Sequence, residues 1–81
     1  MFVEYRENHV PRGDILKLVR YLEAHDGFWE YKGMKVELDP TVDFEDQNVL
    51  VRWTDVNEGF NDKIIVNSLE EFKKEFSLLN D

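Results

Sequence analysis

Residues 49–79 constrain the fold more than any other part of the 81-residue chain. Two runs of β-branched and aromatic residues, 49–54 and 63–66, flank a segment rich in Asn, Asp and Gly, and this pattern predicts a β-hairpin. Ser68 precedes Glu71 by three residues, which is the spacing of a capping box and predicts the start of a helix. The apolar stripe of that helix comprises Leu69, Phe72, Phe76 and Leu79. The hairpin and the helix can therefore bury their apolar faces against each other.

Another helix is predicted ahead of this stretch, at about residues 15–25. Asp14 is suited to cap its N-terminus, and Gly27 lies where a left-handed residue would end it. Its apolar face comprises Ile15, Leu18, Val19 and Leu22. Residues 12–14 spell an adhesion tripeptide, but three residues recur often by chance, so we interpret them as the start of this helix.

A further hairpin is predicted between the two helices. Residues 28–31 and 34–38 flank the Lys-Gly pair at 32–33, and a two-residue connection with Gly in second place is typical of a tight turn. The Asp-Pro pair at 39–40 is expected to end the second strand, because Pro has no N–H to donate to a ladder. Residues 41–48 are then expected to form an acidic loop.

These elements predict an α+β domain that spans residues 1–81. Residues 2–6 alternate only weakly between polar and apolar, and they suggest a short first strand with Val3 and Tyr5 inward. The order is then β-α-β-β-β-β-α, which predicts a mostly antiparallel sheet of three to five strands with two helices packed on one of its faces. The order of the strands within the sheet stays open.

The composition indicates the setting in which the chain folds. With no Cys there is no disulfide and no thiolate metal site, so packing alone must stabilise the domain. Hydrophobic residues make up 42% of the chain, which is enough for a core despite the 35% that are charged. No apolar run approaches the length of a membrane span, and the first residues do not resemble a signal peptide. We therefore expect a soluble, cytoplasmic protein.

The residues that could carry out catalysis are few. His9 and His25 are the two imidazoles, and we interpret them as solvated or helix-capping residues. The four glycines are far apart and match no phosphate-binding loop, so we expect no cofactor. An enzyme remains an alternative only through carboxylates, such as Glu30 or Glu37 beside Tyr31.

The segment after the fourth predicted strand bears a weak likeness to a calcium-binding loop. Asp55, Asn57 and Gly59 follow the pattern in part, but Phe60 and Val66 occupy the positions where Gly and Glu are expected. The flanking segments are predicted strands rather than helices. We expect no functional metal site here.

The distribution of charge is the feature that bears on function. Residues 37–62 contain eight acids and one base, a net charge of −7 against −8 for the whole chain. Most of these acids fall in the predicted loops 39–48 and 55–62. Sequence leaves open whether the two loops meet at one end of the sheet or lie at opposite ends.

Two interpretations account for this acidic segment. A small domain needs net charge for solubility, and loops are commonly polar. Alternatively, the acids form a docking surface for a basic partner, with aromatic anchors among them, because interface energy concentrates in buried aromatic residues. The partner-binding residues predicted by the second interpretation are Asp39, Asp43, Phe44, Glu45, Asp46, Asp55, Glu58, Phe60 and Asp62.

The sign of the charge also restricts the class of partner. A free acidic domain repels phosphates, so direct binding to nucleic acid or to an anionic membrane is not expected. The expected partner is a protein with a basic surface, and a special case is a nucleic-acid-binding protein that the acids inhibit by imitating phosphates. The alternative is a regulatory or assembly subunit that pairs through an apolar helix face or a sheet edge. The oligomeric state is open.

Phe60 is the predicted anchor of the docking surface. It lies in a turn, where an aromatic side chain gains little unless something covers it. Asp55, Glu58 and Asp62 surround it, as rim charges would. The alternative is that Phe60 folds back over the sheet beside Trp53.

Overall fold

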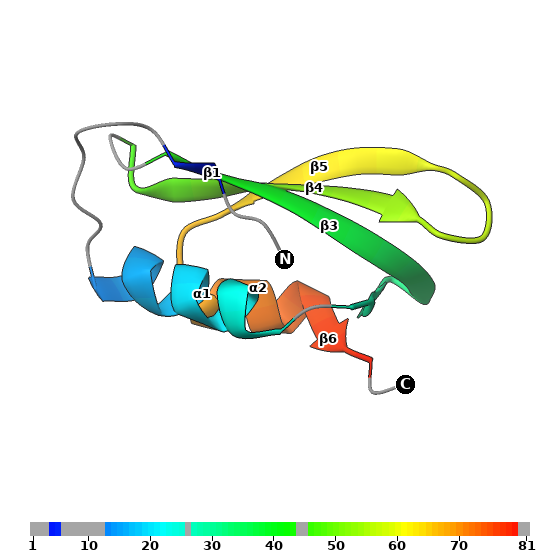
Figure 1. The fold of residues 1–81 in the computed structure, drawn as a ribbon, viewed down its shortest axis with the longest axis horizontal. Helices are drawn as coiled ribbons and strands as arrows, with labels where there is room; N and C mark the ends of the chain where they lie inside the picture. Colours follow the sequence, from blue (N-terminus) through cyan, green and yellow to red (C-terminus); the bar gives the residue numbers. More distant parts are fainter. Residues whose placement is uncertain (1–3, 6–12, 26, 44–45, 80–81) are drawn as a thin grey trace.

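The computed structural model describes residues 4–5, 13–25, 27–43 and 46–79 (Figure 1). Within these ranges the elements are β1 (Glu4–Tyr5), α1 (Gly13–Ala24), β2 (Trp29–Tyr31), β3 (Met34–Asp43), β4 (Asn48–Asp55), β5 (Asn61–Val66), α2 (Leu69–Glu75) and β6 (Phe76–Leu78). The predicted α+β class, the mostly antiparallel sheet and the two packed helices are confirmed.

The sheet is organised around β3. Its antiparallel strands follow the order β5-β4-β3-β2-β6. β4 pairs with β3 from Val36 to Asp43, whereas the other edge of β3 is shared by β2 at residues 34–36 and by β1, which runs parallel, at residues 41–42. In Figure 1 the helices α1 and α2 lie side by side beneath β3, β4 and β5. One face of these strands is therefore covered and the opposite face is not covered by either helix.

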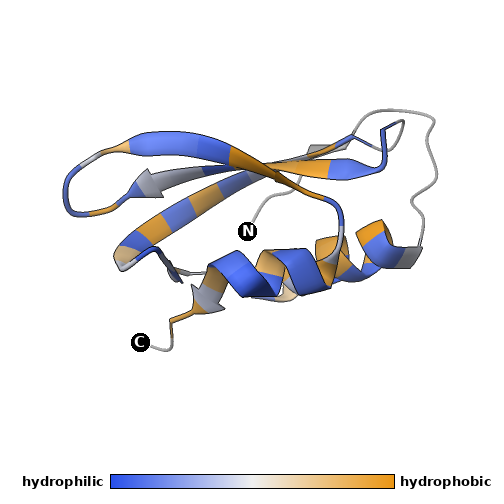
Figure 2. Ribbon diagram, turned by 180° about the vertical axis from the view of Figure 1, so that it is seen from behind, coloured by the Kyte–Doolittle hydropathy of each residue, from blue (hydrophilic) through white to orange (hydrophobic). Residues whose placement is uncertain are grey.

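The core forms between the helices and the inner face of the sheet. Alternating positions of β3 and β4 point inward, and Figure 2 shows this alternation as orange and blue bands along β3. The buried side chains include Val36, Val42, Val49, Val51 and Val66 from the strands and Ile15, Leu18, Leu22 and Phe72 from the helices. Because the chain contains no Cys, no disulfide contributes to stability, and this packing must stabilise the fold.

Aromatic rings fill the part of the core where β2 and β6 meet the helices. The ring of Trp29 packs edge-on against Phe72 with centroids 5.2 Å apart, and Phe72 stacks on Phe76 at 4.8 Å. Tyr31 also stacks on Phe76, with centroids 4.5 Å apart. Edge-to-face and offset pairs at these separations are favourable, so the short strands β2 and β6 are held by their side chains as well as by their ladder.

Local signals in the sequence are confirmed at the turn between β2 and β3 and at the C-terminal end of α1. Lys32 and Gly33 have φ of 48° and 80°, as the tight turn between β2 and β3 requires. Gly27 has a φ of 110° just after α1, and the Nδ1 atom of His25 lies 2.8 Å from the carbonyl oxygen of Tyr21, which fits a histidine that caps the helix. The prediction that Asp14 caps α1 is wrong, because the helix begins at Gly13 and Asp14 lies inside its first turn.

The prediction that residues 39–40 end a strand is wrong. β3 continues through Pro40 to Asp43, and the predicted loop 41–48 is reduced to the turn between β3 and β4. Pro40 is fully buried on the inner face and lies between the segments of β3 that pair with β2 and with β1. A strand tolerates Pro where one of its edges has no ladder to complete, which explains why the strand is not broken.

The predicted helix 69–79 is also too long. Ser68 caps α2 as expected, since its Oγ accepts a hydrogen bond from the amide of Glu71 at 3.1 Å, and the Glu71 carboxylate accepts one from the amide of Asn67 at 3.1 Å. The helix nevertheless ends at Glu75, and Phe76–Leu78 forms β6 in antiparallel pairing with β2. The apolar side chain of Phe76 is buried either way, so its spacing could not distinguish a helix from a strand.

Candidate interaction surface

The two acidic loops lie at opposite ends of the sheet. β4 pairs with β3 in a hairpin whose turn follows Asp43, and it pairs with β5 in a second hairpin whose turn follows Asp55. β4 has eight residues and at about 3.3 Å per residue separates the two turns by roughly 25 Å. The seven predicted partner-binding residues that the structure describes therefore do not form one surface. Phe44 and Glu45 lie outside the described residues.

Asp39 lies on the outer face of the sheet and is paired with a base. Its Oδ2 atom accepts a hydrogen bond from Arg52 at 3.3 Å, and the same guanidinium donates to the Thr41 hydroxyl at 2.9 Å. Both charged side chains are exposed, so the ion pair contributes little to stability. It does cancel the local charge of Asp39, and this makes Asp39 a poor member of a strongly acidic patch.

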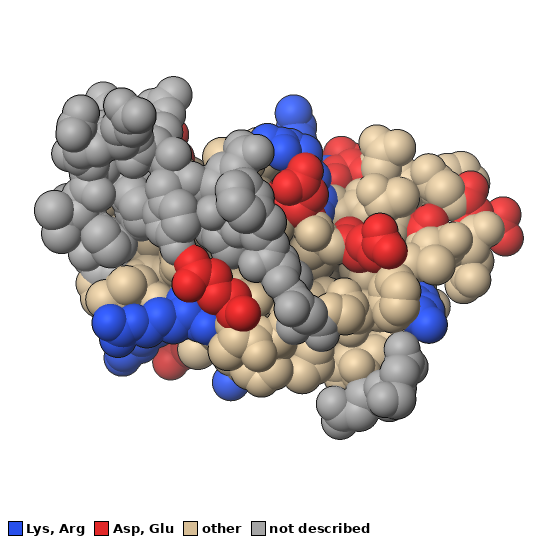
Figure 3. All heavy atoms as spheres, in the orientation of Figure 1, with Lys and Arg blue, Asp and Glu red and all other residues tan. Residues whose placement is uncertain are grey.

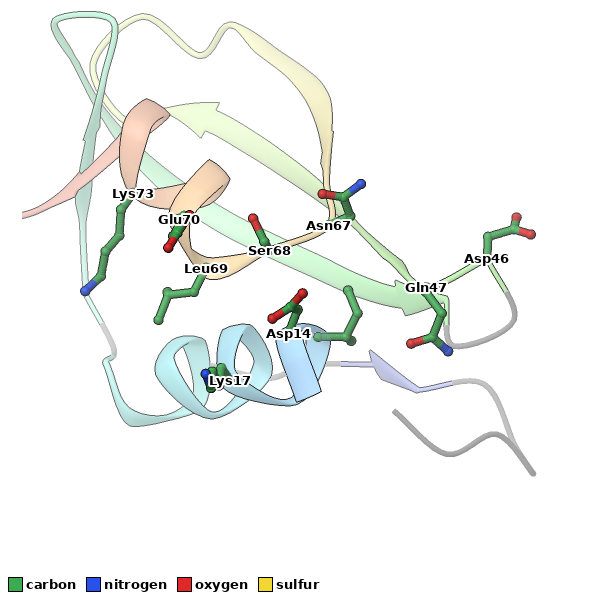
Figure 4. Close-up of a pocket in the computed structure, with 10 residues that line it drawn as sticks. Asp14, Lys17, Asp46, Gln47, Asn67, Ser68, Leu69, Glu70 and Lys73 are labelled. Carbon is green, nitrogen blue, oxygen red and sulfur yellow. The ribbon is translucent and has the colours of Figure 1, made fainter. Parts of the chain in front are cut away.

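Asp43 is the last residue of β3, and Asp46 lies in the turn between β3 and β4. The Asp43 carboxylate accepts a hydrogen bond from the backbone amide of Asp46 at 3.2 Å, which is a turn-stabilising contact. Asp46 also lines an open groove of about 790 Å³ between this turn and the N-terminal ends of α1 and α2 (Figure 4). The contacts that the structure shows for these two acids lie within the turn or in the groove beside it.

The groove brings together residues from three distant segments of the chain. Its charged side chains are mixed in sign: Asp14, Asp46, Glu70, Lys17 and Lys73. Lys73 in addition lies over the ring of Tyr21 at 4.8 Å, which links α2 to α1. Sequence reasoning did not identify this groove, because no single segment carries a signal for it. A mixed-charge, solvent-open groove offers no preference for one sign of ligand.

Asp55 holds the turn between β4 and β5 together. Its carboxylate Oδ1 accepts hydrogen bonds from the amides of Asn57 at 2.9 Å and Glu58 at 3.4 Å. Its backbone amide donates to the carbonyl of Phe60 at 2.7 Å, and its carbonyl accepts from Gly59 at 2.9 Å. The residue is only 5% exposed, so the structure places it beneath the turn rather than among exposed rim charges. The signal for this role was the Asp-x-Asn pattern at the start of a Gly-containing turn.

Phe60 projects from this turn into solvent. It is 66% exposed, and the alternative in which it folds back beside Trp53 is wrong. The ring of Trp53 instead packs against Tyr31, with centroids 5.1 Å apart. A large aromatic side chain is therefore displayed by a turn whose backbone is fixed by four hydrogen bonds at Asp55.

Two more apolar side chains are exposed near Phe60 and along the neighbouring strand. Val56 in the turn is 42% exposed and Ile65 on β5 is 60% exposed, and these three are the exposed large hydrophobic residues in the described part of the chain. Sequence reasoning did not identify Val56 or Ile65 as surface residues. The alternation of β5 contained the signal for Ile65, because its neighbours Ile64 and Val66 point toward the inner face.

Acidic side chains accompany the exposed apolar residues. Glu58 and Asp62 are both exposed, and Figure 3 shows acidic side chains at the end of the molecule that carries this turn. The Asp62 carboxylate accepts a hydrogen bond from the amide of Lys63 at 2.8 Å. We name this set of residues the hairpin tip and define it as Val56, Glu58, Phe60 and Asp62. It combines an aromatic side chain with charges of one sign.

Several other features of the described ranges bear on the choice of function. They contain no group of three or more His, Asp or Glu side chains that could hold a metal ion. None of their helices is long and apolar enough to cross a membrane. The turn that resembled a calcium loop is flanked by strands, as expected, and its Asp55 carboxylate already binds backbone amides.

Comparison with known proteins gives no relative for this chain. No protein-family model matches it, and no curated protein or solved structure matches it significantly.

Proposed function

We propose that this protein is a small acidic, non-enzymatic interaction domain that docks a basic partner protein through the hairpin tip. The observation that carries the proposal is the exposure of Phe60, 66%, on a turn whose backbone is hydrogen-bonded. An exposed aromatic side chain on an ordered turn loses little conformational entropy when a partner covers it, and aromatic residues are enriched among interface hot spots.

The charge of the chain supports the choice of a basic partner. The net charge is −8, and Glu58 and Asp62 lie beside Phe60 without belonging to the core. Charges at the rim of an interface accelerate encounter with a partner of opposite sign and disfavour acidic competitors. We also assign the protein to the cytoplasm, where a domain without Cys needs no oxidising environment.

The special case of nucleic-acid imitation receives less support from the described residues. The outer face of β3 carries Glu37, Asp39 and Asp43, and a two-residue step along a strand spans about 7 Å. Arg52 neutralises the central member of this row, Asp39. We therefore restrict the proposal to a basic protein surface and do not require the partner to bind nucleic acid.

A second candidate function is assembly through a sheet edge. The observation that favours it is that β5 lies at one edge of the sheet and exposes Ile65. In this case the partner would be held by backbone pairing and apolar contact, and ionic strength would have little effect on binding.

Capture of the partner at two salt concentrations distinguishes the two functions. The tagged chain and its Phe60→Ala variant are incubated with a lysate of the source cells at low salt and at about 0.5 M salt, where the Debye length is about 4 Å. We expect a basic protein to be captured at low salt by the original chain, and to be lost both at high salt and with the variant. Retention of the same partner under all conditions would favour the assembly function.

A further inference from the structure

We infer that β5 is the edge to which an extended, positively charged segment of the partner adds as a further strand. This inference rests on the proposed function and extends it, because it assigns recognition to the backbone of β5 as well as to the hairpin tip. Strand addition is a common mode of peptide recognition in which main-chain hydrogen bonds provide affinity and alternate side chains provide specificity.

The edge offered by β5 is long and regular. β5 pairs with β4 through six consecutive residue pairs, from Val49↔Val66 to Thr54↔Asn61, and ends the strand order. No other described strand pairs with it. The opposite end of the sheet is β6, which has only three residues. Of the two ends, β5 is therefore the one that can hold a segment of useful length, about 20 Å at 3.3 Å per residue.

The features that usually protect an edge strand are confined to the first half of β5, where Asp62 and Lys63 are charged. It contains no Pro, and its six consecutive pairs with β4 leave no room for a bulge. Lys63 is its one base, while Ile65 presents a β-branched side chain that is 60% exposed on the outer face. Natural proteins cover, shorten or charge such edges to prevent uncontrolled pairing. An edge with these properties is a template for a strand.

A second copy of this chain is a poor occupant of the edge. Two-fold antiparallel pairings centred on Asp62 or on Lys63 place like charges directly opposite each other, which is destabilising. A pairing centred on Ile64 avoids these contacts but still joins two chains that each carry a net charge of −8.

A basic extended segment fits the charges better. β5 itself carries one acid and one base, so the attraction comes from the net charge of −8 and from a base in the segment that lies opposite Asp62, while an apolar residue of the segment lies opposite Lys63. A β-branched residue can lie opposite Ile65, whose side chain is exposed on the outer face. The segment then continues toward the hairpin tip, where Phe60 is exposed. The predicted occupant therefore alternates basic and β-branched residues and lacks Pro.

Synthetic peptides of about ten residues test this inference on the full-length chain. The probes are a peptide of alternating Arg and Val, the same peptide with Glu in place of Arg, and the Arg-Val peptide with alternate amides N-methylated so that one edge cannot pair. Affinity and location are measured by titration of the ¹⁵N-labelled protein followed by NMR, together with amide hydrogen exchange.

We expect the Arg-Val peptide to bind at least about tenfold more tightly than the Glu-Val or N-methylated peptides. We also expect exchange to slow about tenfold or more at those amides of β5 that do not donate to β4. Asp62→Lys should reduce the preference for Arg over Glu, whereas the same reversal at Glu75, an exposed acid at the end of α2, should not.

The remaining outcomes separate strand addition from docking at the tip. Absence of binding, equal binding of the N-methylated peptide, or changes that map to the groove between α1 and α2 would each overturn strand addition. If the captured partner depends on Phe60 but leaves the β5 amides unprotected, docking at the tip stands and strand addition is wrong. If the β5 amides are protected in a dimer of the chain alone, the occupant is a second copy.

Discussion

The backbone amide of Asp55 donates a hydrogen bond to the carbonyl oxygen of Phe60 over 2.7 Å, so one turn joins a buried carboxylate to an exposed aromatic ring. Asp55 is 5% exposed and Phe60 is 66% exposed. Asp55 orders the turn, and Phe60 is exposed to solvent. Substitutions at the two positions should therefore affect stability and binding differently.

Truncation of Phe60 should affect binding rather than folding. Because the side chain is largely exposed, we expect Phe60→Ala to change the free energy of unfolding by less than about 0.5 kcal/mol, measured by urea denaturation. Loss of an anchor should weaken partner binding by about 2 kcal/mol, measured by calorimetry. Phe72→Ala is the control for a core ring and should cost about 3–5 kcal/mol of stability. A loss of stability at Phe60 comparable to that of the control would show that Phe60 belongs to the core in solution.

Truncation of Asp55 should loosen the turn. Asp55→Ala leaves the amides of Asn57 and Glu58 without their acceptor, and we expect it to lower the free energy of unfolding by about 1–3 kcal/mol. Asp55→Asn retains an acceptor oxygen and should cost less. Denaturation measures the stability, and amide exchange of Gly59 reports the order of the turn. Equal effects of the two substitutions would contradict a role that depends on the acceptor oxygen.

Charge reversal at the hairpin tip should act on the rate of association. Glu58→Lys together with Asp62→Lys should slow association with a basic partner by about tenfold or more at low salt and flatten its salt dependence. Both residues are exposed, so the free energy of unfolding should stay within about 0.5 kcal/mol. Stopped-flow kinetics measures the rate. Glu75→Lys is the control, because it changes the net charge in the same direction at a position away from the hairpin tip. If it slows association as much per reversed charge, the location of the charges at the hairpin tip does not matter.

The cap of α2 should be worth a measurable part of the stability. The Ser68 hydroxyl accepts a hydrogen bond from the amide of Glu71 at 3.1 Å, and its loss in Ser68→Ala should cost about 1 kcal/mol. Ser77→Ala is the matched control, since Ser77 is exposed on β6 and should tolerate the change within about 0.5 kcal/mol. Urea denaturation measures the free energy of unfolding of both variants. Equal values for the two would mean that the cap of α2 does not contribute to the stability of the domain.

The turn between β2 and β3 should require Gly at its second position. Gly33 has a φ of 80°, and an Ala there should cost about 1–2 kcal/mol because its Cβ disfavours the left-handed region. Gly13 begins α1, and a Cβ built on it meets no atom within 4 Å. Gly13→Ala should therefore be neutral or stabilise the protein by up to about 1 kcal/mol. Thermal denaturation ranks the two variants, and the opposite order would contradict the turn geometry.

The sequence predicted those features that depend on neighbouring residues. The Lys32–Gly33 turn, the Ser68 cap and the inward alternation of β4 follow from backbone preferences and from the two-residue period of a strand. Phe60 was also identified correctly as a turn residue, because Gly and Asn surround it. Local chemistry is sufficient for such features, since the interacting groups are only a few positions apart in the chain.

Tertiary pairing decided the features that depend on distant partners. Phe76 forms a strand rather than a helix because Tyr31 and the edge of β2 lie beside it, and Pro40 stays in β3 because its free edge has no ladder to complete. The strand order placed the acidic loops at opposite ends of β4 and buried Asp55 beneath its turn. The sequence by itself therefore determined the helices, the hairpins and the excess of acids. Only the tertiary structure decided which acids and apolar side chains share a surface, because a one-dimensional pattern does not specify which strand edges meet.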